Sequence, residues 1–109
     1  MIRKFQFDQF NKGRKKLVKH IVMWNLKDEK DGDAVKNKLL SMSKEIEEIK
    51  NIQVGLNVKT GGTTHDVILI TEHDSFDNLQ KYQDHPYHLE IKKFIPKYCK
   101  DRVCVDFEF

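Results

Sequence analysis

The chain has 109 residues, 39% of them hydrophobic and 34% charged, which fits one small domain and excludes two full cores. No apolar run approaches the roughly 20 residues of a membrane span, and the N-terminus lacks the apolar stretch of a signal peptide, so we expect a cytoplasmic protein. The net charge of +3 arises in residues 1–17, which hold six basic side chains and one aspartate. The basic domain face that nucleic-acid binding requires is therefore not expected.

Residues 1–16 are predicted to form a flexible basic N-terminal extension, and residues 17–109 to form one domain. Residues 12–16 combine one glycine with four basic residues, a composition that interrupts any regular element. Disorder is the default at chain termini. Two alternatives stay open, namely an arm that packs on a partner and a start of translation near Leu17.

The segment 18–26 is predicted to be a strand that is apolar on both faces. Ile21 and Met23 lie on one face. The opposite face carries Val18, His20, Val22, Trp24 and Leu26. A strand of this kind is expected to be covered on both sides.

The segment 34–50 has the clearest helical pattern, with Asp33 as its predicted N-cap. Its apolar stripe is formed by Val35, Leu39, Met42, Ile46 and Ile49. A second strand is predicted over 52–58 and a third over 65–72, with a turn at Gly61 and Gly62. The third strand is again apolar on both faces.

The segment after Ser75 is predicted to form two consecutive helices. Ser75 is a suitable N-cap for the first, which turns Phe76, Leu79 and Tyr82 inward. The pair His85-Pro86 interrupts it, and Pro86 suits the first turn of the second helix. We expect Pro96 to end or kink that helix, and residues 102–109 to form the last strand.

The element order β-α-β-β-α-β predicts an α+β, ferredoxin-like fold with an antiparallel four-stranded sheet and helices on one face. The opposite face would expose Ile21, Met23, Ile68 and Ile70. Wetting such a face forfeits several kcal/mol at roughly 25 cal/mol per Å². A homodimer that packs two sheets face to face through these residues, a dimeric α/β barrel, is therefore expected.

The chain resembles the stress-responsive dimeric α/β-barrel (Dabb) family over about residues 18–107. The resemblance is carried by the start of the strand at 18–24, by the strands at 54–58 and 65–67, and by the closing 103–107. Its specific part is the segment 79–88, with the pattern Tyr-x-x-His-Pro-x-His. The resemblance implies a ferredoxin-like fold in which two chains close one barrel.

The resemblance also implies site residues. One plant member, olivetolic acid cyclase, cyclises a linear polyketide by an aldol route, and its catalytic tyrosine and histidine correspond to Tyr82 and His88. Cavity histidines of that enzyme correspond to His20 and His65. Val22 and Trp24, on the strand face of His20, are expected to contact a substrate with them, although the bulk of Trp24 argues against a long alkyl tail.

The side chains themselves support cofactor-free chemistry. A neutral histidine accepts a proton from an activated carbon, and a tyrosine hydroxyl stabilises an enolate oxygen. The alternative is a non-catalytic, stress-associated dimer whose histidines only stabilise the fold. Related monooxygenases of this fold class are a lesser alternative, without an oxygen-handling group to support it.

No metal and no cofactor is predicted. The five histidines lack an HExxH-like spacing, and Gly61-Gly62 lacks the lysine of a phosphate-binding loop. Cys99 and Cys104 are too few for a disulfide framework and are expected to be reduced, partly buried thiols. The expected partners are a second copy of the chain and a small molecule.

Overall fold

The computed structural model describes residues 16–59 and 61–109. The predicted flexible extension over 1–16 therefore lies outside the described residues, except for Lys16. Its structure stays a prediction.

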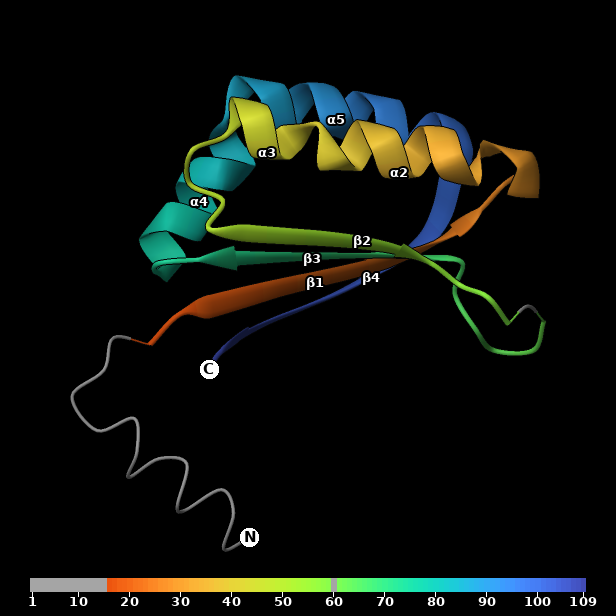
Figure 1. Cartoon of the computed structure of the whole chain (residues 1–109), viewed down its shortest axis with the longest axis horizontal. Coiled ribbons are helices and arrows are strands. Elements are labelled where there is room, and N and C mark those ends of the chain that lie inside the picture. Colours follow the sequence, from red (N-terminus) through yellow and green to blue (C-terminus); the bar gives the residue numbers. More distant parts are fainter. Residues whose placement is uncertain (1–15, 60) are drawn as a thin grey trace, which may run out of the picture.

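Four antiparallel strands form one sheet in the order β2-β3-β1-β4. The strands are β1 (Val18–Leu26), β2 (Asn51–Leu56), β3 (Val67–His73) and β4 (Cys99–Glu108). The helices are η1 (Glu29–Asp31), α2 (Gly32–Leu40), α3 (Met42–Glu45), α4 (Phe76–Asp84) and α5 (Pro86–Tyr98). The long helices lie on one face of the sheet (Figure 1). The predicted ferredoxin-like fold is confirmed.

The predicted helix over 34–50 is wrong in its bounds. Helix starts earlier, at Gly32, is interrupted at Ser41, and ends at Glu45. Asp33 lies inside the first turn instead of at the N-cap. Ile46 is extended yet only 1% exposed, because the chain must turn back here to enter β2. The helical spacing of apolar residues therefore correctly predicts that Ile46 is buried, although the helix has already ended.

The connection between β2 and β3 contains the predicted turn. Gly61 and Gly62 have φ angles of 95° and 68°, a left-handed region that glycine adopts without strain. Val58 was predicted to belong to the strand but lies beyond β2 and is fully exposed. His65 likewise precedes β3, which begins at Val67.

The two helices after β3 begin as predicted, with Ser75 as the N-cap of α4 and Pro86 in the first turn of α5. The Ser75 hydroxyl accepts a hydrogen bond from the Asn78 amide at 3.1 Å and so caps α4. The prediction that Phe76 points inward is wrong, since its side chain is 50% exposed. Pro96 does not end α5, because the helix continues to Tyr98.

The sheet face that carries no helices is apolar across three strands. The register aligns Ile70, Ile21 and Val105 in one row across β3, β1 and β4. A second row is formed by Ile68, Met23 and Val103. Val105 is 60% exposed, so this face is open to solvent in a single chain.

No helix in the part of the chain that the structure describes is both long and apolar enough to cross a membrane. The cytoplasmic location predicted from the composition stays a prediction.

Candidate functional site

A cavity of about 630 Å³ lies between the sheet and the helices α4 and α5. Strand β1 contributes His20, Val22 and Trp24 to its wall, and the two helices contribute Tyr82 and His88. Aliphatic side chains complete the wall: Leu39, Leu69, Leu89, Ile91 and Ile95. The volume falls within the range of about 300–1,000 Å³ that is usual for small-molecule sites.

Tyr82 is the centre of the polar part of this wall and is fully buried. Its ring packs against three imidazoles, with centroid distances of 4.6 Å to His88, 4.8 Å to His73 and 5.8 Å to His20. Its hydroxyl contacts the Met42 sulfur at 3.8 Å, a weak acceptor. Burial raises the pKa of Tyr82 well above its usual value, so the hydroxyl stays a neutral hydrogen-bond donor.

His88 is held in a defined tautomer by the turn before it. Its Nδ1 lies 2.9 Å from the carbonyl oxygen of Gln83, which can only accept, so Nδ1 carries the proton. The free acceptor of the neutral ring is therefore Nε2. Burial lowers the pKa of His88 to about 4, although the hydrogen bond to Gln83 opposes this change. His88 is thus a neutral acceptor at physiological pH.

The junction before His88 is fixed by its own sequence. The His85 side chain accepts from the Tyr87 amide at 3.0 Å and is the N-cap of α5. Pro86 occupies the first turn, where its missing N–H leaves no bond unmade. This capping gives His85 a structural role.

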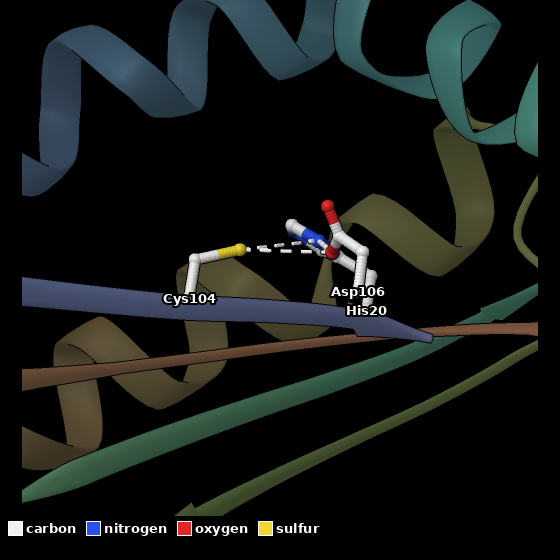
Figure 2. A group of neighbouring side chains, drawn as sticks. All are labelled: His20, Cys104 and Asp106. Atoms are coloured by element: carbon white, nitrogen blue, oxygen red, sulfur yellow. Dashed lines mark hydrogen bonds and ion pairs between the residues drawn. The ribbon is translucent and has the colours of Figure 1, made fainter. Parts of the chain in front are cut away.

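His20 reaches the cavity from β1 and is only 2% exposed. Its Nδ1 lies 2.5 Å from a carboxylate oxygen of Asp106 on the neighbouring strand β4. The Cys104 sulfur lies 3.7 Å from the same nitrogen (Figure 2). The carboxylate fixes the orientation of the ring, since a buried imidazole with such a partner has one favoured tautomer.

His65 is not among the residues that line the cavity. Its Nε2 lies 3.1 Å from the carbonyl oxygen of Asp101, a residue that does line it. Asp101 has a φ of 57° and lies close to a register shift between β1 and β4. Bulges of this kind are common beside functional sites. His65 thus contacts the backbone of the wall instead of the cavity.

His73 was not predicted to be near the site, although it continues the alternation of Val67, Leu69 and Thr71 on one face of β3. It is fully buried, and its Nδ1 donates to the Glu48 carbonyl at 2.9 Å. Its Nε2 lies 2.8 Å from the Thr71 hydroxyl, so both nitrogens are used. Burial lowers the pKa of His73. The alternation of side chains along β3 is the sequence signal that places His73 on the same face as Leu69.

The cavity wall carries more cations than acids. Lys92, Lys100 and Arg102 line it, against Asp84 and Asp101. The positive charges of Lys92 and Arg102 lower the pKa of His88 further. This balance favours a ligand that carries or develops negative charge.

Residues 18–109 match the family described as the stress responsive A/B barrel domain, Dabb. The chain belongs to the Dabb family. The match covers all four strands and all the helices of the fold. The resemblance predicted from the Tyr-x-x-His-Pro-x-His segment is therefore confirmed.

Solved structures of similar proteins share the Dabb architecture. A dimeric ferredoxin-like protein of unknown function from Bacteroides fragilis is 33% identical, with a TM-score of 0.71 over 85% of this chain and 96% of that one. A dimeric ferredoxin-like protein from Thermobifida fusca is 25% identical, with a TM-score of 0.76 over 88% and 93%. No curated protein matches the chain.

One neighbour with the same fold is an enzyme. The hydroxynitrile lyase of Passiflora edulis is 17% identical, with a TM-score of 0.77 over 87% of this chain and 94% of that one. This likeness concerns the fold alone.

Proposed function

We propose that this Dabb protein is a homodimer that binds a small carbonyl compound in the cavity and promotes enolisation, with aldol-type ring closure as the resulting reaction. The observation that carries the proposal is a single cavity of about 630 Å³ that reaches both Tyr82 and His88. A filled space beside His88 would have argued against it.

The positions of Tyr82 and His88 support a division of labour. The Tyr82 hydroxyl is a neutral donor, so it can donate a hydrogen bond to the carbonyl oxygen of the ligand. The free Nε2 of His88 can take a proton from the carbon beside that carbonyl. The resulting enolate carbon attacks a more distant carbonyl of the same molecule, one that is not bonded to that carbon, a C–C bond forms, and the new alkoxide takes the proton back from His88.

The low pKa of His88 restricts the substrate class. A base with a pKa of about 4 removes protons only from carbons that are already acidic. We therefore propose a compound with a 1,3-dicarbonyl unit, which supplies the acidic carbon, and a further carbonyl along the chain, which the enolate attacks, instead of a simple ketone. Negative charge on the enolate is stabilised by Arg102, which lines the same cavity.

The remaining predicted contacts keep their roles in this proposal, with one change. His20, Val22 and Trp24 line the cavity and would contact the ligand. His65 lies outside the cavity, against the backbone of Asp101, and has no contact with the ligand in this proposal. A substrate without a long alkyl tail needs no channel for one, so the bulk of Trp24 does not exclude it.

The homodimer is supported by two observations. The sheet face of Ile21, Met23, Ile68 and Ile70 continues onto the exposed side chains of β4. The similar proteins of Bacteroides fragilis and Thermobifida fusca are dimeric. Two such faces packed together would bury both apolar surfaces.

The test uses ethyl 2-methylacetoacetate, a 1,3-dicarbonyl with one exchangeable proton. We expect the protein to accelerate loss of that proton in D₂O, followed by proton NMR. His88→Ala should abolish the acceleration, whereas His65→Ala, a matched histidine outside the cavity, should retain it. Absence of acceleration in the wild-type dimer would favour the second candidate, a non-catalytic module whose histidines stabilise the fold. The two-sided hydrogen bonding of His73 supports that candidate.

A further inference from the structure

A group of three unlike metal-binding side chains lies where β1 meets the edge strand β4 (Figure 2). We propose that His20, Cys104 and Asp106 bind one zinc ion per chain. The inference goes beyond the proposed function and does not rest on it, because its test measures bound metal and not turnover.

The strand register brings the three side chains to one place. His20 pairs with Asp106, and the next cross-strand neighbours on the same face are Val22 and Cys104. Side chains two residues apart on a strand point to the same face, which here is the face toward the helices. Residues more than 80 positions apart in the sequence thus converge through backbone pairing alone.

Two of the three donor-to-donor distances fit a tetrahedral zinc ion. Bonds of about 2.0–2.3 Å place nitrogen, sulfur and oxygen ligands about 3.3–3.6 Å apart at tetrahedral angles. The Cys104 sulfur lies 3.7 Å from His20 Nδ1 and 3.6 Å from Asp106 Oδ1. The third distance, 2.5 Å from His20 Nδ1 to Asp106 Oδ1, is shorter than a tetrahedral zinc ion requires. Zinc binding therefore requires this one pair to separate by about 0.8 Å.

A nucleophilic relay fits the same three residues less well. In such a relay the thiol and the carboxylate contact different nitrogens of the histidine. Here Cys104 and Asp106 both approach Nδ1. Three donors that converge on one point are the arrangement of a chelate.

The donor set and its surroundings favour zinc over harder cations. One imidazole, one thiolate and one carboxylate suit zinc, whereas magnesium and calcium prefer oxygen ligands alone. Three protein ligands leave a fourth position for water or a ligand, as in catalytic zinc sites. Cys104 and Asp106 are exposed, which provides an entry path, while His20 is buried with its ring edge against Tyr82.

The test uses the untagged full chain after treatment with a chelator. Titration with zinc, followed by calorimetry, should give one site per chain. Titration with cobalt(II), the spectroscopic substitute, should give a thiolate-to-cobalt charge-transfer band and tetrahedral d–d absorption. Cys104→Ser and Asp106→Asn should each weaken zinc binding by at least about tenfold, since each removes one of three ligands.

Two variants serve as matched controls. Cys99→Ala removes the other thiol, and Glu108→Gln neutralises the next carboxylate on the same face of β4. Both should bind zinc as the wild type does. The proposal is overturned when cobalt binds without the thiolate band, when Cys104→Ser keeps wild-type affinity, or when no zinc binds at all. Cys104 is exposed, so its replacement decides the question even where Asp106→Asn fails to fold.

Discussion

The rings of Tyr82 and His88 pack with their centroids 4.6 Å apart, although the two residues belong to different helices. In one continuous helix, side chains six residues apart point about 120° away from each other. The break at His85 and Pro86 removes this constraint and turns both side chains toward one cavity. The helix interruption in the sequence is therefore what creates the site.

Replacement of Tyr82 by phenylalanine separates catalysis from packing. The hydroxyl contacts the Met42 sulfur, a weak acceptor, and the Thr71 side chain, so Tyr82→Phe should lower the free energy of unfolding by only about 1 kcal/mol. Loss of a donor to a developing oxyanion should lower the exchange rate of ethyl 2-methylacetoacetate by about 10²–10³-fold. Urea unfolding and the NMR exchange assay measure the two effects. An unchanged rate would remove Tyr82 from the proposed mechanism.

The low pKa of His88 predicts a pH-dependent stability. The folded protein holds His88 neutral down to about pH 4, whereas the unfolded chain takes up the proton near pH 6.5. The unfolded state thus binds more protons between these values, so the free energy of unfolding should fall as the pH is lowered from 6.5 to 4. Urea unfolding at several pH values measures this slope.

The variant His88→Asn isolates the contribution of His88 to that slope. Burial also lowers the pKa of His73, so part of the pH dependence should persist in the variant. The slope of the variant should nevertheless be smaller than that of the wild type. Equal slopes would show that the pKa of His88 is the same in the folded and unfolded protein.

The fold could be predicted from the sequence because each element carries a local signal. Only neighbouring residues are needed to recognise a strand that is apolar on both faces, the N-cap at Ser75 or the helix start at Pro86. The helix and strand bounds that were predicted wrongly depend on residues that are distant in the sequence. Ile46 fits a helical spacing, but the helix ends there because the chain must reach the edge of the sheet.

The site was predictable only in part for the same reason. Tyr82 and His88 lie six residues apart in a segment with a recognisable pattern, and His20 shares a strand face with Trp24. The contact of His20 with Asp106 and Cys104 depends on the register between the first and last strands. Spacing along the chain contains no signal for it, which explains why no metal site was expected.

The cap of α4 predicts a measurable loss of stability. Ser75 accepts from the Asn78 amide, which is otherwise an unpaired donor of the first turn. Ser75→Ala should therefore lower the free energy of unfolding by about 1 kcal/mol. Ser43→Ala, which removes an exposed hydroxyl that donates to the Leu40 carbonyl, is the control and should change it by less than about 0.5 kcal/mol. Equal effects of the two replacements in urea unfolding would contradict the capping role.

The exposed apolar rows of the sheet predict a charge-sensitive dimer. Val105 is 60% exposed and lies on the edge strand β4 beside Ile21, on the face that carries no helices. A lysine at this position would be buried without a partner in a face-to-face dimer, so Val105→Lys should raise the dimer dissociation constant by about 100-fold or more. Val58→Lys is the matched control, because Val58 is fully exposed outside the sheet. Sedimentation equilibrium over a dilution series measures both variants. A dimer that tolerates Val105→Lys as well as Val58→Lys must use another surface, since an unpaired ammonium cannot be buried between two apolar sheets without a large loss of affinity.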